Sequence, residues 1–446
     1  MKYYKFEAKK DRNSEVKIFA NQKIYQQLES DSIKQLFNAA KLPTVTGVIG
    51  LPDMHKGYGL PIGGVMASKN IISPGAVGYD INCGVRLLTT ELETKTLQAK
   101  LTDLIKNLGN TIPKGREKKK LYNFSKKEFK KILKQGLPYL CNRLNYGFNN
   151  DIKASESQGC FSAAKIDKVS NKALKRGSTQ LGSLGSGNHF VEIQKVAEIY
   201  QPTTQLFKGQ LVFMIHSGSR GLGHQIASDY IAEAKNIAQQ NNTSIPNENL
   251  AYFKADSKAG QDYFAAMSAA ANFAFANRQL MTDTLRQIVS KNLNLPPEKI
   301  TLYQDIAHNT VRKETHNLDE QQKDLFIHRK GACYLPENNT ALLPGSMGTA
   351  SYIIEAKNTK ANKLSFYSTA HGAGRKMSRR QAKREITTQK HQASIAKIEL
   401  VTNDSKNAID ESPLAYKNIN SVIDSLNQSG IATPIAKVKP LAVIKG

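Results

Sequence analysis

The chain has 446 residues, of which 63 are Lys or Arg and 37 are Asp or Glu, so its formal net charge is +26. Its hydrophobic content of 40%, with 16 Phe and 17 Tyr, excludes a disordered chain, and the lack of heptad or Gly-X-Y repeats excludes a fibrous one. The length predicts one large domain with insertions, or two to three domains. The excess positive charge indicates an acidic partner such as nucleic acid, although Lys-rich surfaces also serve solubility.

No export signal is recognisable at the start of the sequence, and no window approaches the roughly 20 apolar residues of a membrane helix. The most apolar candidate, residues 264–276, is short and contains Ser268 and Asn272. A disulfide framework is not expected, because no CxxC pair occurs among the four cysteines, Cys83, Cys141, Cys160 and Cys333. The sequence therefore predicts a soluble, cytoplasmic protein with no membrane partner.

The predicted elements alternate between helices and strands along the chain. Helical periodicity is clearest at residues 32–40, 226–237 and 262–291. Glycine-rich loops between short apolar runs are expected from 45 to 86, and the Lys-rich segment 95–180 is expected to be a helical insertion. Strands are expected at 211–215, 300–303, 324–327, 351–354, 364–367, 397–401 and 438–444. This pattern predicts an α+β fold, with one large mixed domain over residues 1–446 that contains the insertion.

Two dense basic runs strengthen the case for nucleic acid. One extends from Lys114 to Lys134 and the other from Arg375 to Arg384. Such runs indicate affinity for phosphates without saying what is done to them. For the first run, solvated decoration of the surface is an equal alternative.

Most of the reactive side chains lie in glycine-bearing segments. Glycine lets the backbone turn tightly there and approach a ligand closely. A single His or Cys is more often an ordinary core residue, but five such segments in one chain favour a functional site. The segments are Pro52–Gly59, Gly78–Gly84, Gly185–Phe190, His216–Gly221 and His371–Arg375.

One of these segments offers two metal-binding groups close together. Asp80 and Cys83 lie three residues apart between glycines, so a carboxylate and a thiolate can converge, and His189, His216 and His308 offer imidazole nitrogens. This mixed set suits Mn²⁺, Zn²⁺, Fe²⁺ or Co²⁺ rather than Mg²⁺ or Ca²⁺. A thiolate that bridges two metal ions would be deprotonated at neutral pH.

A nucleotide, if bound, is not held by a Walker A loop, because the sequence contains no Gly-Lys dipeptide. Residues 344–351 offer consecutive backbone N–H groups and hydroxyls, which suit either a phosphate cradle or a plain turn. His371 stands in a glycine loop four residues before Arg375. An imidazole can attack an α-phosphate and hold the nucleotide as a phosphoramidate, with an arginine to offset the charge. The alternatives for His371 are another metal ligand or an orienting hydrogen bond.

In this order, the five segments resemble the RtcB family of RNA ligases, from about Leu51 to Gly446. The match is weak over residues 1–45 and in the Lys-rich stretch after Thr94, and Met54 stands where the family often has valine or alanine. Further matching motifs are Lys175–Gly177, Gln180–Gly182, Gln304–Asn309, His328–Ala332 and Tyr416–Ile419.

The resemblance implies GTP-dependent joining of an RNA 3′-phosphate or 2′,3′-cyclic phosphate end to a 5′-hydroxyl end, with two Mn²⁺ ions. It implies a GMP–histidine intermediate and an activated RNA 3′ end. The RNA partner would be tRNA halves or cleaved RNA, in splicing or repair, and an activating protein would be a further partner.

The resemblance also implies residue roles. His371 would be the nucleophile, and the metal ligands would be Asp80, Cys83, His189, His216 and His308, with Cys83 as the bridge. Arg220, Lys330 and Arg379 would contact RNA or phosphate. Glu192, Tyr416 and Lys445 would form a guanine pocket that prefers guanine to adenine. The full set of GTP or GMP contacts would be Asn188, Glu192, Asn309, Pro344, Gly345, Ser346, Met347, Ser351, His371, Gly372, Ala373, Gly374, Arg375, Tyr416 and Lys445.

Two other hypotheses stay open at this point. One is a dinuclear-metal phosphohydrolase or nuclease that uses Asp80 and Cys83 without a nucleotide. The other is a non-catalytic RNA-binding protein. The complete ligand set together with His371 argues against the second, because a binding protein needs neither a thiolate nor a nucleophilic imidazole.

Overall fold

Two β-sheets form the framework, and the computed structural model describes residues 3–9, 12–97, 99–115, 117, 119–202, 205–318, 321–402 and 408–446. The six-stranded sheet has the order β1 (Tyr4–Phe6), β2 (Val16–Ile18), β3 (Val45–His55), β4 (Ile62–Ser68), β12 (Gln321–Lys330) and β11 (Asn309–Leu318). The eight-stranded sheet has the order β10 (Thr301–Ala307), β6 (Gly84–Glu93), β8 (Gln210–Ser217), β7 (Phe190–Ile199), β18 (Ala432–Lys445), β15 (Ser351–Ala356) and β14 (Thr340–Leu343), with β17 (Glu399–Thr402) beside β18. Two short pairs complete the strands, β13 (Ala332–Tyr334) with β16 (Ser368–Ala370) and β5 (Ile71–Ile72) with β9 (Phe253–Lys254).

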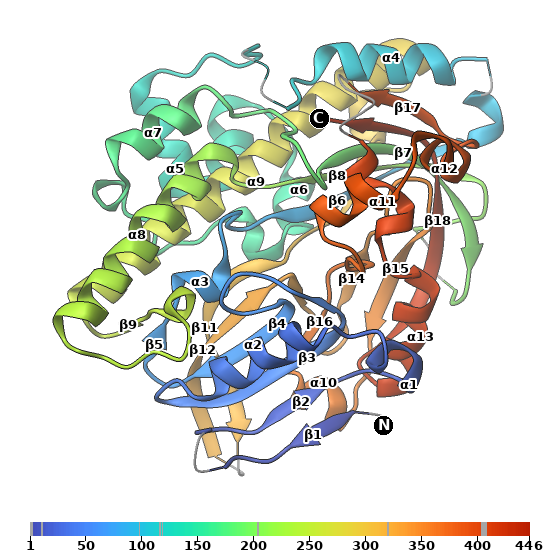
Figure 1. Ribbon diagram of the computed structural model, residues 1–446. Helices are drawn as coiled ribbons and strands as arrows, with labels where there is room; N and C mark the ends of the chain where they lie inside the picture. The colour runs from blue at the N-terminus through green and yellow to red at the C-terminus, as the bar shows by residue number, and fades with distance from the viewer. Residues whose placement is uncertain are drawn as a thin grey trace.

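The helices lie around these sheets, and several of them gather on one side of the molecule (Figure 1). Together the helices and sheets form one mixed domain, which confirms the α+β prediction. None of the described helices is both long and apolar enough to cross a membrane. The helices are α1 (Gln22–Tyr25), α2 (Ser30–Ala40), α3 (Pro74–Val77), α4 (Leu101–Thr111), α5 (Lys126–Leu144), α6 (Asn149–Lys153), α7 (Asn171–Ser178), α8 (Arg220–Gln240), α9 (Lys258–Leu293), α10 (Lys360–Leu364), α11 (Arg379–Glu385), α12 (Thr388–Ser394) and α13 (Ile419–Ser429).

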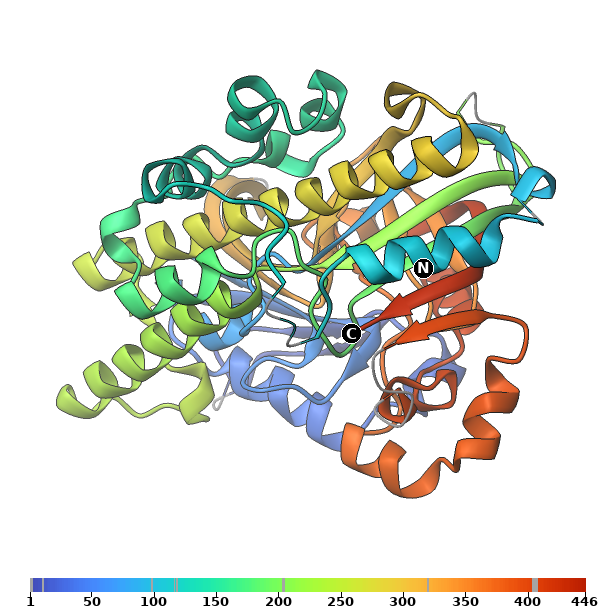
Figure 2. The same ribbon diagram turned by 90° about the horizontal axis from the view of Figure 1, so that it is seen from above.

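The helices α4, α5 and α8 pack against the long helix α9. Its first turn is capped by the Ser257 hydroxyl, which accepts from the backbone N of Gly260 at 3.1 Å, and it ends at Asn294 in the left-handed conformation. Its alanine-rich half packs against α5 and α8, and its other half packs against α4 and the eight-stranded sheet. Seen from above, α9 runs across most of the molecule (Figure 2).

The segment 95–180 is helical, as expected, and contributes α4, α5, α6 and α7. The helix α5 bends at Gly136, where φ is +59° and a Cβ would lie 2.3 Å from the carbonyl oxygen of Gly159. Only glycine fits this close approach. The division of the chain at residues 95–180 stays a prediction.

The first basic run, Lys114 to Lys134, is described in part, because Arg116 and Lys118 lie outside the described residues. Lys114 is only 6% exposed, and its Nζ donates to the carbonyl oxygen of Gly109 at 2.5 Å. This lysine therefore packs inside the fold and does not decorate the surface.

Residues 45–86 hold more regular structure than the expected glycine-rich loops, since β3 and β4 fill much of this region. Glycine serves the packing of β3 here. A Cβ at Gly50 would lie 2.9 Å from Cδ1 of Leu36, so glycine lets α2 approach the strand closely.

The strand expected at residues 364–367 is wrong. The helix α10 ends at Leu364, and Phe366 and Tyr367 have φ values of 53° and 50°, which an extended strand does not allow. The turn is fixed by the Ser365 hydroxyl, which donates to the backbone oxygens of Asn362 and Ser368 at 2.9 Å. Local side-chain hydrogen bonds make a turn here instead of a strand.

The two sheets meet at His308. This single residue separates β10, in the eight-stranded sheet, from β11, in the six-stranded sheet. The segments before β6 and β7 and those at the ends of β3 and β8 come together around this point.

Candidate metal centre and nucleotide site

A cavity of about 810 Å³ opens at this junction of the two sheets. All five glycine-bearing segments contribute to its lining, although they are scattered over the chain. The fold therefore brings together the segments that the sequence analysis singled out. In chain order, one lining residue from each segment is Tyr58, Asp80, His189, His216 and His371.

Two groups of potential metal ligands share Cys83 inside this cavity. Asp80, Cys83 and His189 form one group, and Cys83, His216 and His308 form the other, with the ligand atoms of each group within 4.8 Å of one another. The Cys83 Sγ lies 3.3 Å from Nε2 of His189 and 3.2 Å from Nε2 of His216. Oδ2 of Asp80 lies 2.8 Å from Nε2 of His189. This is the arrangement expected for a thiolate between two metal positions.

The chemistry of the five side chains fits a pair of transition-metal ions. The Nδ1 atoms of His216 and His308 are buried and have no hydrogen-bond partner among the described residues. Burial lowers the pKa of both imidazoles, which keeps them in the neutral form that binds metals. Nδ1 of His189 lies 3.0 Å from the carbonyl oxygen of Leu184, and this contact directs Nε2 toward the other ligands.

The ionisation of the acidic ligands depends on their neighbours. Burial opposes ionisation of Asp80, but the adjacent His189 holds the pKa of this carboxyl below its usual range. Burial raises the pKa of the Cys83 thiol, with the Asp80 charge acting in the same direction. A bound cation reverses this effect and stabilises the thiolate.

The loop that carries Asp80 and Cys83 is held by Asn309. The backbone N of Asn82, whose φ is 55°, donates to the Asn309 carbonyl oxygen at 2.7 Å. The Asn309 side chain in turn donates to the carbonyl oxygen of Asp80 at 3.0 Å. These two bonds tie the ligand loop to the residue that follows His308.

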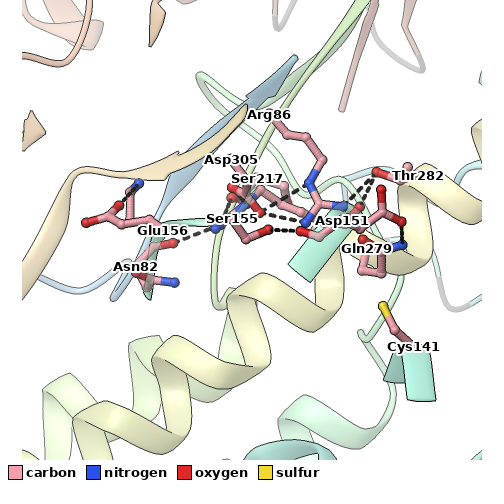
Figure 3. Close-up of polar contacts among 12 residues, drawn as sticks. Asn82, Arg86, Cys141, Asp151, Ser155, Glu156, Ser217, Gln279, Thr282 and Asp305 are labelled. Carbon is pink, nitrogen blue, oxygen red and sulfur yellow. Dashed lines mark hydrogen bonds and ion pairs between the residues drawn. The ribbon is translucent and has the colours of Figure 1, made fainter. Parts of the chain in front are cut away.

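A buried ionic network lies next to two of the candidate ligands, and Figure 3 shows its residues Arg86 and Asp305 with Asn82 and Ser217 nearby. The Asp305 carboxylate accepts from Nη2 of Arg86 at 2.6 Å and from Nε of Arg278 at 2.8 Å, and all three side chains are 0% exposed. Nη1 of Arg278 also donates to the backbone oxygens of Asn82 at 2.9 Å and Ser217 at 3.0 Å. These carbonyls belong to the direct neighbours of Cys83 and His216, so the network fixes the backbone beside two ligands.

His371 follows β16 and stands next to the ligand groups. Its ring centroid lies 4.8 Å from that of His308. Oδ2 of Asp53 accepts from both the backbone N of His371 at 3.0 Å and its Nδ1 at 2.6 Å. This contact places the proton on Nδ1 and leaves the lone pair on Nε2.

Most of the residues expected to contact GTP line the cavity, but not all of them. Within the loop 344–351, the backbone N–H groups of Gly345 and Ser346 already donate to Ser351 Oγ at 3.0 Å and to Thr349 Oγ1 at 2.7 Å. These two groups are therefore not free to bind a phosphate. Those in the lining are Asn188, Asn309, Pro344, Gly345, His371, Gly372, Ala373, Gly374, Arg375 and Tyr416. Those outside it are Glu192, Ser346, Met347, Ser351 and Lys445.

Glu192 and Lys445 lie on the neighbouring strands β7 and β18 and are both buried. Burial raises the pKa of Glu192 to about 7, although Gln194 and Lys445 favour the ionised form. The Lys445 ammonium donates to the carbonyl oxygen of Gly187 at 3.0 Å. The pair therefore borders the Gly185–Phe190 segment of the cavity.

The guanidinium of Arg375 is bound to other protein groups. It lies 4.9 Å above the ring of Tyr416, donates to the Asp410 carbonyl oxygen at 2.6 Å and pairs with Glu411 at 3.3 Å. Arg379 pairs with the same carboxylate at 3.0 Å. Glu411 was not expected from the sequence, since it belongs to none of the glycine-bearing segments.

All three residues expected to contact RNA or phosphate line the cavity, and each already has protein partners. Arg220 donates to Ser183 and to the Gly115 carbonyl oxygen, both at 3.1 Å. Lys330 donates to the carbonyl oxygens of Gly75, at 2.9 Å, and Tyr58, and burial lowers its pKa to about 7.

The family model described as tRNA-splicing ligase RtcB matches residues 35–446. The chain belongs to the RtcB family. It is 40% identical over 454 residues to a tRNA-splicing ligase RtcB of Methanococcus maripaludis, and the match covers 96% of this chain and 94% of that protein. An RNA-splicing ligase RtcB of Mycobacterium tuberculosis is 38% identical over 438 residues, which cover 92% of this chain and 100% of that protein.

Membership in the RtcB family confirms the resemblance inferred from the motifs and assigns the chain to the ligase class of enzymes. Several side chains of the site were nevertheless missed. Asp53 lies in the Pro52–Gly59 segment, but the sequence indicated no role for it. Its contact with His371 forms only when the chain folds. The other missed residues in or beside the cavity are Tyr58, Tyr79, Arg176, His224 and Glu411.

We expect Asp305→Asn to lower the free energy of unfolding by about 3–5 kcal/mol, because two buried guanidinium charges lose their shared carboxylate. Urea unfolding measures this change. The control is Asp324→Asn, since Asp324 forms an exposed ion pair with Lys313 and should leave stability nearly unchanged. Equal stability of the two variants would contradict the structural role of the network.

We expect Cys83→Ala to weaken Mn²⁺ binding by more than about tenfold, because Cys83 belongs to both groups of candidate ligands. Titration of the metal-free protein with Mn²⁺, followed by metal analysis, gives affinity and stoichiometry. Cys141→Ala, at another buried free cysteine, is the control. Retention of two ions at unchanged affinity would rule out the bridging role.

Proposed function

We propose that the protein joins RNA ends with a 3′-phosphate or 2′,3′-cyclic phosphate to ends with a 5′-hydroxyl, using GTP and two Mn²⁺ ions. The observation that carries this proposal is the position of His371, held by Asp53 and adjacent to His308 of the shared-thiolate centre. The names of the relatives point to tRNA splicing, so the RNA would be tRNA halves or cleaved RNA in the cytoplasm, with an activating protein as a further partner.

In the first step, His371 acts as the nucleophile. Its Nε2 lone pair attacks the α-phosphorus of GTP, and the bond to the bridging oxygen breaks, so pyrophosphate leaves with the electron pair. Asp53 accepts the Nδ1 proton in a hydrogen bond and stabilises the imidazolium that forms. Metal ions held by the two ligand groups would supply positive charge to the phosphates and activate a hydroxyl.

In the following steps, water first hydrolyses a 2′,3′-cyclic phosphate end to a 3′-phosphate. An oxygen of the 3′-phosphate then attacks the phosphorus of the GMP on Nε2 of His371, so a phosphoanhydride bond forms and the bond between nitrogen and phosphorus breaks. The 5′-hydroxyl then attacks the activated phosphate, and GMP leaves. The original 3′-phosphate becomes the phosphodiester of the joint. Arg220 and Arg379 line the same cavity and provide positive charge for the incoming RNA phosphates, and Lys330, which also lines it, adds charge in its protonated form.

The guanine specificity of this reaction would come from Glu192, Tyr416 and Lys445. A carboxylate accepts from the N1 and N2 donors of guanine, and an ammonium donates to O6, whereas adenine offers neither pattern. Glu192 and Lys445 lie on adjacent strands, and Tyr416 lines the cavity. Their buried position makes each unpaired polar group costly, which favours the complementary base.

We expect radiolabelled GTP to leave an acid-labile, alkali-stable label on the protein that depends on Mn²⁺ and is absent in His371→Ala. Asp53→Asn should lower the labelling rate by at least about a hundredfold, because the amide no longer fixes the proton on Nδ1. The labelling is followed by gel and phosphorimager. An unlabelled wild-type protein with full metal occupancy, or phosphoester cleavage without GTP, would refute the ligase proposal.

We expect the affinity for GTP to rise about tenfold from pH 6 to pH 8, because Glu192, with a pKa near 7, must lose its proton to accept from guanine. The Glu192→Gln variant should bind weakly and lose this pH dependence. Protonation of GTP itself affects the wild type and the Glu192→Gln variant equally. The difference between their pH profiles therefore reports the protonation of Glu192. Parallel pH profiles of the two proteins would exclude the carboxylate as the guanine acceptor.

A further inference from the structure

Three aromatic side chains from separate segments lie together in the wall of the catalytic cavity. The rings of Tyr79 and His224 are stacked, with centroids 4.9 Å apart and an interplanar angle of 28°. The ring of Tyr58 meets Tyr79 edge-on, at 6.3 Å and 90°. All three residues line the cavity, and we call them the aromatic platform. No step proposed above uses them.

Tyr58 is an exposed ring on an anchored backbone. It is 68% exposed, the highest value among the large hydrophobic side chains described as exposed. The backbone N of the preceding Gly57 donates to Gln35 at 3.0 Å, and the Tyr58 carbonyl oxygen accepts from the buried Lys330 ammonium. At Gly59, φ is +71° and a Cβ would lie 2.6 Å from the carbonyl oxygen of Asn249. Such anchoring presents the ring to solvent at a small entropic cost.

The platform begins next to the metal centre. Tyr79 immediately precedes Asp80, so their Cα atoms are about 3.8 Å apart. His224 lies one turn after Arg220 on α8, and Arg220 lines the same cavity. A ring held on this platform would therefore belong to a nucleotide whose phosphate lies close to the ligands.

Positive charges surround the aromatic platform. Lys56, Arg176 and Arg220 line the cavity, and Arg176 is positioned by a hydrogen bond to Gln225 at 2.9 Å. Aromatic faces combined with cationic side chains are the usual means of binding single-stranded nucleic acid without sequence preference. The net charge of +26 is consistent with the same class of partner.

We propose that the aromatic platform stacks a nucleobase of one of the two RNA ends that meet at the metal centre. The proposal rests on the proposed function for the identity of the strand, but the platform makes a separate contact from GTP. The guanine pocket proposed above would centre on Glu192 and Lys445, which are outside the lining that contains the platform, and only its third member, Tyr416, lines the cavity. Stacking would orient the terminal nucleotide and lower the KM for RNA without selecting its sequence.

The test uses the full-length, Mn²⁺-loaded protein with Tyr58→Ala and Tyr79→Ala, and compares GTP labelling with the joining of short RNAs. We expect the KM for RNA to rise roughly 5- to 150-fold, which is the range of one base stacked on an aromatic ring. Any fold-change in the rate of GTP labelling should be at least tenfold smaller than the fold-change in the KM for RNA. Tyr79→Phe retains a ring and should restore RNA binding, which separates stacking from misfolding. Tyr200→Ala, at a tyrosine that is 44% exposed outside the cavity, is the control.

Abasic RNAs identify the base that stacks. We compare RNAs with an abasic nucleotide at the 3′-phosphate end or at the 5′-hydroxyl end. The RNA that lacks the stacked base should show no further rise in KM when Tyr58 is replaced by Ala, as in a double-mutant cycle. If neither abasic RNA changes this penalty, or if the KM for GTP rises as much as the KM for RNA, the proposal is overturned.

A binding measurement that needs no catalysis distinguishes a failure of the ligase proposal from a failure of the platform proposal. RNA with 2-aminopurine at the stacked end should lose fluorescence when it binds, because stacking quenches this base. Loss of the quenching in Tyr58→Ala supports the platform even in an unlabelled protein. Equal quenching by the wild type and by Tyr58→Ala overturns it even in an active ligase.

Discussion

The site depends on one buried ion triplet, in which Asp305 lies between Arg86 and Arg278. Asp305 belongs to β10, Arg86 to β6 and Arg278 to α9, so the triplet joins the eight-stranded sheet to the long helix. Buried ion pairs are weak evidence for net stability, because desolvation offsets much of their attraction. Their value here is positional, since the Arg278 guanidinium also bonds the backbone beside Cys83 and His216. Gly84 permits this, because a Cβ there would lie 3.0 Å from Cζ of Arg278.

The second constraint is the junction of the sheets at His308. The six-stranded sheet supplies Asp53 at the end of β3, and this residue orients His371. The eight-stranded sheet supplies Cys83 and His216 from the ends of β6 and β8. The proposed chemistry needs both sets of groups, one to carry GMP and the other to hold metal ions. Loops at the meeting edges of two sheets can satisfy this requirement because a rigid framework fixes each of them.

The sequence predicted the parts that depend on local pattern and missed those that depend on distant contacts. Helical periodicity revealed α9, apolar runs revealed six of the 18 strands in the described residues, and the clustering of His, Cys and Asp in short motifs pointed to the candidate metal ligands. The contact between Asp53 and His371 joins residues 318 positions apart, so no spacing rule could detect it. The turn at Phe366 and Tyr367 was missed because hydrogen bonds of Ser365 outweigh the strand preference of aromatic residues.

The positive charge that first suggested nucleic acid is organised differently in the two basic runs. In the first, the Lys114 ammonium bonds a backbone oxygen and is withdrawn from solvent, whereas the other described lysines of the run are exposed. In the second, Arg375 and Arg379 reach the cavity, and both pair with Glu411. A shared carboxylate of this kind holds two guanidinium groups in place before any phosphate arrives, so less side-chain entropy is lost when one binds. Internal partners therefore hold the guanidinium groups of Arg375 and Arg379 in place near the site. The rest of the excess positive charge acts at longer range to attract RNA.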